Sequence, residues 1–247
     1  MTGQEGASVV REQRLVRAFV ELADTLVSGF DVVEFMSMLA ARSVDLLDLA
    51  AAGVLLDDQR GQLRVVAASD EKVRLLELLE LQHDGGPCTE AFHRGVAVQV
   101  GAAEALRRWP RFATQAAGLG YQVMCALPLR LRDQTVGALN LFRATTQPLD
   151  AVDLGVGQAL ADVATIGLLQ ERSMRESRLL AEQLQVALNS RVALEQAKGV
   201  LAEQTGLSID QAFEVLRRFA RQHNLRLVDV ARRVVSGELS GSGIAGL

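Results

Sequence analysis

The sequence has few of the residues that mark secreted, metal-binding or membrane proteins. Only two of its 247 residues are cysteines, Cys88 and Cys125, too few for the disulfide framework of a small secreted protein. Their spacing also fits no metal motif. The N-terminal segment is polar and lacks the basic and then apolar pattern of a signal peptide. No apolar run approaches the roughly 18 residues of a membrane span. We therefore expect a cytoplasmic protein with no membrane partner.

Lysine is almost absent as well. Lys72 and Lys198 are the only lysines among 26 basic residues, and the rest are arginines. Because arginine codons are GC-rich, this bias indicates a high-GC genome rather than a function for each arginine. The net charge of −4 gives no hint of a nucleic-acid partner. However, basic side chains outnumber acidic ones between residues 189 and 240, so this part is net positive while the remainder is net negative.

The hydrophobic pattern of residues 11–143 predicts an α+β domain. Apolar residues at helical spacing alternate with runs at strand spacing. Helices are expected at 11–27, 32–49, 71–82 and 109–117, with a further helix beginning at Cys88, and strands at 51–57, 63–69, 96–100, 121–131 and 135–143. The turns at 59–62 and 132–134 join strand pairs directly. This order predicts an antiparallel sheet flanked by helices.

No strand signal follows Asp150, which is a natural N-cap for a long helix. The helix is apolar at first and strongly charged over residues 170–182, which favours an exposed helical linker. A partial heptad permits a dimer seam, although Arg191 and Lys198 interrupt its other register. The seam residues are Leu180, Leu184, Ala187, Leu194 and Leu201.

Two shorter helices complete a predicted three-helix bundle. Ser208 and Gln211 form a capping box that starts the second helix, and a break at 223–224 leads to the third. The expected inward residues are Ile209, Ala212, Phe213, Leu216 and Ala220 in the second helix, and Leu227, Val230, Ala231 and Val234 in the third. Gly199 interrupts the first helix, and close approach of a neighbouring helix would explain it. The Gly/Ser-rich tail predicts disorder.

The segment Ser190-Arg-Val-Ala-Leu-Glu-Gln-Ala-Lys-Gly-Val-Leu-Ala-Glu-Gln-Thr-Gly206 resembles the ANTAR family of RNA-binding antitermination domains. Ala212-Phe213, Leu216-Arg217, Phe219-Ala220 and Leu227-Val-Asp-Val-Ala231 continue the resemblance over about 55 residues. It implies a domain that binds paired stem-loops in a leader transcript. Such binding disfavours a terminator hairpin, and gene expression rises.

The earlier part of the chain resembles GAF sensor domains. The resemblance rests on Gly86-Pro-Cys-Thr-Glu-Ala-Phe-His-Arg-Gly95 and on the strand segments Leu127-Pro-Leu129 and Leu139-Asn-Leu141. The pairing with an ANTAR domain is typical of actinobacterial regulators. We expect a flexible N-terminus at 1–13, the sensor domain at 14–172, a linker at 173–184, the RNA-binding module at 185–238 and a disordered tail at 239–247.

The resemblance implies that basic residues of the C-terminal module contact RNA, because such a surface neutralises phosphates and meets unpaired loop bases. As ordinary solvated charges they would have no such role. Phe219 is either a stacking aromatic or a boundary core residue. The candidate RNA-binding residues are Arg191, Lys198, Arg217, Arg218, Arg221, Arg226, Arg232 and Arg233.

The ligand of the sensor domain is not apparent from the residues. Cys88 and His93 are five positions apart, unlike the adjacent pair of bilin-binding relatives, and the Asn-Lys-Phe-Asp-Glu string of cyclic-nucleotide-binding relatives is absent. His83 and His93 lack the neighbours of a haem or metal site. Cys88, after Gly-Pro, is either a redox-sensing thiol with a lowered pKa or a partly buried structural cysteine, whereas Cys125 belongs to the core. No cofactor is evident.

Two alternatives to an RNA-binding regulator remain. Some GAF-type domains reduce free methionine sulfoxide through cysteines, and Cys88 and Cys125 would serve only if their Cα atoms lay within about 6 Å. No other catalytic constellation is present, so an enzyme is not expected. The three helices could instead bind protein as a scaffold. We expect a homodimer, in which a signal either changes the dimer geometry along the linker or releases a sequestered RNA-binding module.

Overall fold

The computed structural model describes residues 2–25, 30–83 and 85–246. The chain divides between Ser173 and Met174 into two compact units. The N-terminal unit is an α+β domain, and the C-terminal unit is entirely helical. This confirms the expected fold class.

A five-stranded antiparallel sheet of order β2-β1-β5-β4-β3 is the centre of the N-terminal unit. Both tight connections fall where the turns were predicted, between β1 and β2 and between β4 and β5. The strands are β1 (Ala51–Asp57), β2 (Leu63–Ala68), β3 (Val98–Gly101), β4 (Val123–Leu131) and β5 (Gln134–Arg143).

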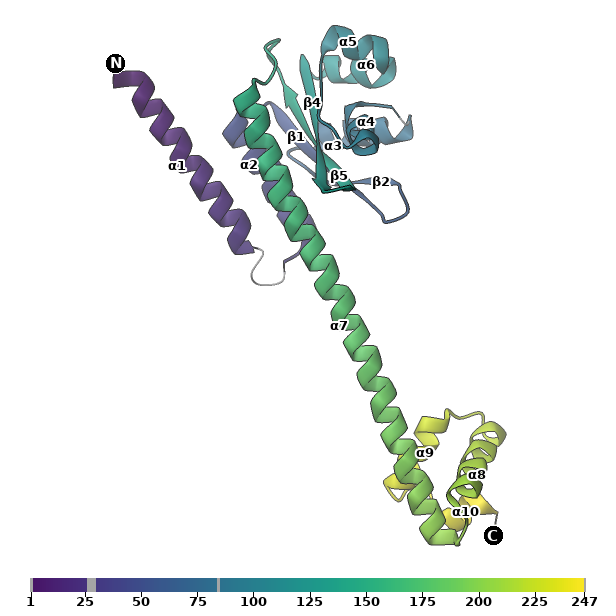
Figure 1. Cartoon of the computed structure of the whole chain (residues 1–247). Helices are drawn as coiled ribbons and strands as arrows, with labels where there is room; N and C mark the ends of the chain where they lie inside the picture. The colour runs from purple at the N-terminus through teal and green to yellow at the C-terminus, as the bar shows by residue number, and fades with distance from the viewer. Residues whose placement is uncertain (1, 26–29, 84, 247) are drawn as a thin grey trace. The chain divides into compact units, whose positions relative to one another are not determined.

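Helices cover both faces of this sheet (Figure 1). One face packs against α1 (Thr2–Thr25), α2 (Val32–Leu47) and the first turns of α7 (Ala151–Thr205). The other packs against α3 (Glu71–Gln82), α4 (Pro87–Arg94), α5 (Ala102–Arg108) and α6 (Pro110–Gly118). For this reason β4 is buried on both sides over most of its length, and only its end is exposed, with Leu131 40% exposed.

Polar contacts hold the ends of the first helices. Asp31 caps α2, with its carboxylate accepting hydrogen bonds from the backbone of Val33 and Glu34 at 2.8 and 3.0 Å. Arg11 of α1 forms an ion pair with Asp153 of α7. Helix α1 begins at Thr2, within the segment 1–13 that was expected to be flexible. The predicted end of this helix, at residues 26–27, lies outside the described residues.

The C-terminal unit contains the end of α7, α8 (Ile209–Gln222), α9 (Leu227–Val235) and α10 (Gly241–Ala245). The capping box is present, because Ser208 and Gln211 exchange side-chain and backbone hydrogen bonds. The last helix lies within the tail that was predicted to be disordered. Ser240 caps it, the Gly241 amide donates to the side chain of Gln204 at 2.7 Å, and Ile244 is 5% exposed.

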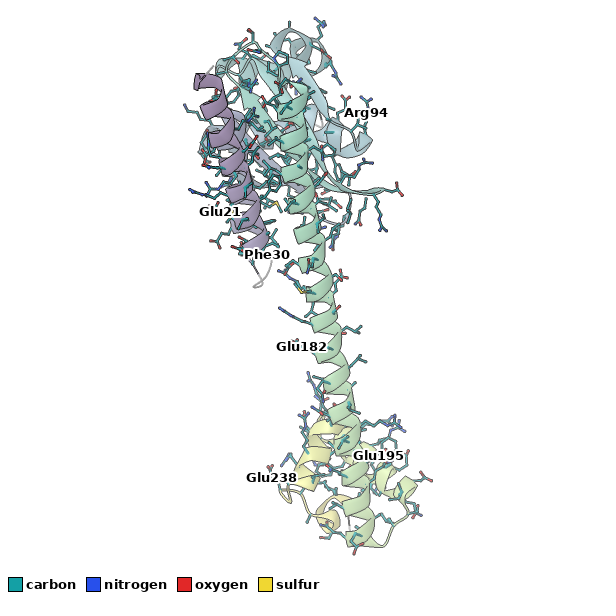
Figure 2. All side chains as sticks on the ribbon, turned by 60° about the vertical axis from the view of Figure 1, so that its left-hand side comes forward. Glu21, Phe30, Arg94, Glu182, Glu195 and Glu238 are labelled. Carbon is teal, nitrogen blue, oxygen red and sulfur yellow. The ribbon has the colours of Figure 1, made fainter. Side chains whose placement is uncertain are left out.

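Helix α7 belongs to both units. By length and composition it contains a window apolar enough to cross a membrane. Its early turns, however, are core residues of the N-terminal unit, with Leu160, Ala161, Ala164 and Leu168 buried. From Arg175 to Asn189 every side chain is exposed, including Glu182 (Figure 2). The apolar window is therefore accounted for by packing within the N-terminal unit.

Candidate functional site

A cation–aromatic group lies on the C-terminal unit, where α7 and α8 meet. The ring of Phe213 has Lys198 Nζ 5.7 Å from its centroid and Arg217 Cζ 5.6 Å from it. Phe213 is half-buried and does not belong to the core of this unit. A flat ring flanked by two cations offers both a stacking surface and charge to a nucleotide.

The sequence pattern predicted Phe213 on the inward face of the second helix, but in the structure Phe213 is not part of the buried face of α8. The buried face of α8 consists of Ala212, Val215, Leu216 and Ala220. Phe213 lies at the edge of this face, and Ile209 is 47% exposed. Because residues four apart follow one another along a helix, Phe213, Arg217 and Arg221 form one stripe beside the core.

The other candidate basic residues are also at the surface. Arg191, Arg218, Arg221 and Arg226 are exposed, and no described acidic side chain forms an ion pair with them. Arg217, Arg232 and Arg233 have acidic partners at 3.2, 3.9 and 3.4 Å, and Lys198 has Glu195 at 2.7 Å. Of the eight candidate residues, only Lys198 and Arg217 are brought together by contacts that the structure describes, because both lie against the ring of Phe213.

Two further expectations for this unit have different outcomes. Phe219 packs against the core and stacks on His223, with ring centroids 4.0 Å apart. It is therefore a boundary core residue, and the His223 ring covers one face of its ring. Gly199 is exposed, and a Cβ placed on it would meet nothing within 4 Å. Close helix approach therefore does not explain this glycine, although the buried Ala197, Ala212 and Ala231 do lie where helices pack.

The two cysteines lie on opposite faces of the sheet. Cys88 packs with α3 to α6, whereas Cys125 packs with α1, α2 and α7. Burial raises the pKa of Cys125 to about 12 and raises that of Cys88 well above its ordinary value. The lowered pKa considered for Cys88 is thus wrong, because burial outweighs the helix N-terminus. A redox pair made of these two thiols has no support in this arrangement.

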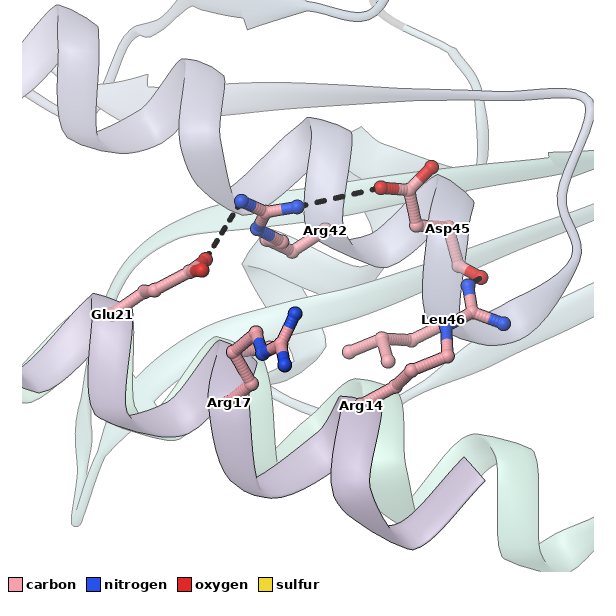
Figure 3. Close-up of a pocket in the computed structure, with 7 residues that line it drawn as sticks. Arg14, Arg17, Glu21, Arg42, Asp45 and Leu46 are labelled. Carbon is pink, nitrogen blue, oxygen red and sulfur yellow. Dashed lines mark hydrogen bonds and ion pairs between the residues drawn. The ribbon is translucent and has the colours of Figure 1, made fainter. Parts of the chain in front are cut away.

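The N-terminal unit carries several surface pockets. Two of them, of about 280 and 480 Å³, share Thr89 and His93 of α4, and Trp109 and Gly86 line the first. A third, of about 160 Å³, lies between α1 and α2 (Figure 3). In it Arg42 pairs with Glu21 and Asp45 at 2.7 and 3.5 Å. Among the described residues, no three His, Cys, Asp or Glu side chains gather as a metal site.

Solved structures share the fold of the N-terminal unit. The GAF domain of a phosphoenolpyruvate-protein phosphotransferase from Coxiella burnetii matches with a TM-score of 0.53 and 12% identity, covering 66% of this chain and 98% of that one. The corresponding Acinetobacter domain gives 0.52 and 13%, covering 70% and 97%. A free methionine-R-sulfoxide reductase from Neisseria meningitidis gives 0.51 and 17%, covering 68% and 93%. At these identities the likeness establishes the fold alone.

Sequence families match both units. The GAF domain family matches residues 31–168, and the ANTAR domain family, one of RNA-binding antitermination domains, matches residues 182–235. No curated protein matches the chain. The matches do not support the finer expectation of an actinobacterial type. The chain therefore belongs to the GAF domain family and carries an ANTAR domain after it.

Proposed function

We propose that this protein is a cytoplasmic transcription antiterminator whose C-terminal unit binds paired stem-loops of a leader RNA under the control of its GAF domain. The observation that carries the proposal is the ring of Phe213 between Lys198 and Arg217, within the ANTAR match. Unpaired loop bases would stack on this ring. The surrounding basic residues would contact phosphates: Arg191, Arg218, Arg221, Arg226, Arg232 and Arg233.

Paired stem-loops imply two copies of the module, and a homodimer would supply them. The exposed apolar residues Leu180 and Leu184, 57% and 61% exposed, are available for a seam. Leu201 is fully buried in the C-terminal unit and Leu194 packs against the same core. The seam expected from the heptad is therefore limited to the linker. A signal at the GAF domain would act through this seam or by releasing the module.

Phe213→Leu is expected to weaken RNA binding by about 5- to 150-fold, since stacking of a base on an aromatic ring contributes about 1–3 kcal/mol. The full-length chain is titrated in a gel shift against an RNA with two adjacent short stem-loops and against a scrambled hairpin, at several salt concentrations. Phe219→Leu is the matched control, and it should reduce stability more than affinity because Phe219 packs against the core.

Two results would contradict this assignment. Equal binding by Phe213→Leu and the unmodified chain would place the interface elsewhere. If the unmodified chain does not prefer the paired stem-loops to the scrambled hairpin, antitermination fails as a function, and a protein-binding scaffold becomes the better interpretation of the three helices.

Gly199→Ala tests why the helix keeps an exposed glycine next to Lys198. The substitution should stabilise the C-terminal unit by about 1 kcal/mol, because the added Cβ meets nothing. We expect RNA affinity to fall nonetheless, since the methyl group would stand on the surface that approaches RNA. Gly155→Ala, in the same helix and equally free of contacts, should leave the affinity unchanged. Circular dichroism and the gel shift separate the two effects, and unchanged affinity in Gly199→Ala would refute the idea.

A further inference from the structure

Two glutamates of the N-terminal unit are fully buried in its core. Glu77 and Glu80 are three residues apart on α3 and point toward the sheet, and both are 0% exposed. The side-chain amide of Asn140, on β5, joins them. Its nitrogen donates to the two carboxylate oxygens of Glu77 at 2.9 and 2.8 Å and lies 3.3 Å from Glu80 Oε2. We call these three residues the carboxylate cluster.

Among the described residues, no cation is paired with the carboxylate cluster. The facing strand β1 contributes Gly53, whose position leaves room for Glu77, and α4 contributes Cys88 and Thr89. Several charged residues of the other adjoining elements have partners outside the cluster. Arg64 of β2 pairs with Asp58, and Arg143 of β5 pairs with Asp153. Arg111 of α6 contacts His83. On α4, Glu90 pairs with Arg94 and with Arg108 of α5, and the His93 ring is hydrogen-bonded to the Thr89 carbonyl.

Two carboxyl groups buried together without a cation cannot both be ionised at low cost. Burial, with the neighbouring Glu80, raises the pKa of Glu77 well above its ordinary value. Burial raises the pKa of Glu80 as well, but only to about 7, because hydrogen bonds from Thr89, Asn140 and Cys88 favour its ionised form. Asn140 Oδ1, buried and without a hydrogen-bond partner in the described structure, is an acceptor inside the same cluster.

The side chain of Glu80 holds the beginning of α4. The helix has Gly86 at its N-cap and therefore no side-chain cap of its own. Instead Glu80 Oε1 accepts a hydrogen bond from the Thr89 amide at 2.8 Å. The contact with Gly86 is close, since a Cβ there would lie 2.3 Å from the Glu80 carboxyl carbon. A change in the protonation of the Glu80 carboxyl group therefore alters the contacts at the N-terminus of α4, where Thr89 lines two pockets.

We propose that the carboxylate cluster is a proton-binding site, and that gain or loss of its proton changes how α4 is held against α3. The signal read by this GAF domain would then include proton concentration. The ionised cluster holds α4 through the charged Glu80 acceptor and the helix N-terminus. On protonation this acceptor loses its charge, and the start of α4 with its adjoining pockets loosens.

The sign of the effect on stability follows from linkage. Glu80 has an ordinary pKa of 4.5 and a pKa of about 7 in the folded protein, so the folded state binds its proton more tightly than the unfolded state. Protonated Glu80 therefore stabilises the folded state as a whole, because burial disfavours its charge, even though protonation weakens its local hydrogen bond to α4. This stabilising contribution is fully present below the ordinary value. The contribution is lost as the pH rises from the ordinary pKa of 4.5 to the folded pKa of about 7. Above the folded pKa the contribution of Glu80 no longer changes with pH.

Trp109 is a built-in reporter for this proposal. It is the only tryptophan, and with Gly85, Gly86 and Thr89 it lines the pocket at the start of α4. Fluorescence of the full-length chain is recorded between pH 5 and 9, and a one-proton transition is expected with a midpoint near the pKa of Glu80, about 7. Glu80→Gln should remove this transition from the neutral range. Glu77→Gln should retain it, because Glu80 keeps its hydrogen bonds from α4.

Histidine is the other side chain that changes charge near neutral pH, so His83→Gln and His93→Gln are the matched controls and should retain the transition. Its loss in either histidine variant, or its persistence in Glu80→Gln, would overturn the proposal. Should Glu80→Gln fail to fold, infrared spectroscopy of the unmodified chain decides the matter. A protonated-carboxyl band that diminishes across the same pH range, and is reduced in Glu77→Gln, supports the proposal, whereas an unchanging band contradicts it.

Discussion

Reversing the charges of Lys198, Arg217 and Arg221 together to glutamate is expected to abolish measurable RNA binding at physiological salt. Lys198 and Arg217 flank the ring of Phe213, and Arg221 continues the same stripe of α8. Each attraction to a phosphate becomes a repulsion, so the affinity should fall at least about 100-fold. The binding should also depend less on salt. Each phosphate contact contributes about 0.7 to the slope of log K against log salt for a single strand, so the loss of three contacts should reduce the magnitude of this slope by about 2.

The control for this experiment carries the same change in net charge elsewhere. Arg60, Arg74 and Arg107 are exposed residues of the N-terminal unit. Their replacement by glutamate should leave the RNA affinity within about 3-fold, since they lie outside the proposed RNA-binding surface and salt screens exposed charges that do not contact the RNA. Gel shifts at matched ionic strength compare the two triple variants. Equal loss in both would show that binding follows overall charge and not this surface.

Gly137→Ala is expected to destabilise the N-terminal unit strongly while the C-terminal unit stays folded. Gly137 on β5 is paired with Leu56 on β1. A Cβ at this position would lie 2.2 Å from the backbone oxygen of Leu55 and 3.1 Å from the Cα of Leu56. Backbone atoms at the centre of a sheet cannot move aside as a side-chain end does, so we expect a loss of about 3 kcal/mol in the free energy of unfolding.

Urea unfolding followed by Trp109 fluorescence measures this effect, because the only tryptophan lies in the N-terminal unit. Gly118→Ala is the matched control, since a Cβ at the end of α6 meets nothing within 4 Å and alanine favours a helix. Its unfolding midpoint should be unchanged or slightly higher. If Gly137→Ala unfolds at the same urea concentration as the unmodified chain, the close pairing of β1 with β5 is wrong.

The parts of the fold that could be predicted from sequence are those encoded by local patterns. Alternation over residues 121–131, and the turn at 132–134, indicated two paired strands, and β4 and β5 confirm them. Ser208 and Gln211 marked the start of α8 through a contact between near neighbours. The short α10 could not be foreseen, because Gly241 is held by Gln204, far away in the sequence.

The candidate functional residues that sequence reasoning missed depend on three-dimensional surroundings. Phe213 has the helical spacing of a core residue, and only the packing of α7 against α8 places it at an edge beside Lys198. Glu77 and Glu80 occur in a charged helix and resemble an ordinary solvated face. Their burial depends on Asn140, about 60 residues further along the chain, and no local signal reveals it.

The two edge strands of the sheet limit how copies of this chain can associate. At one edge β3 has only four residues. Its Gln99 side-chain amide donates a hydrogen bond to the Leu149 carbonyl and accepts one from the Leu149 amide. At the other edge β2 carries the charged Arg64, and its pairing with β1 is irregular where Val54 and Leu55 pair with Ala67 and Val65. Short, charged and irregular edges resist strand-to-strand addition and the aggregation that follows from it. The proposed homodimer would thus use helical surfaces and leave the sheet undisturbed.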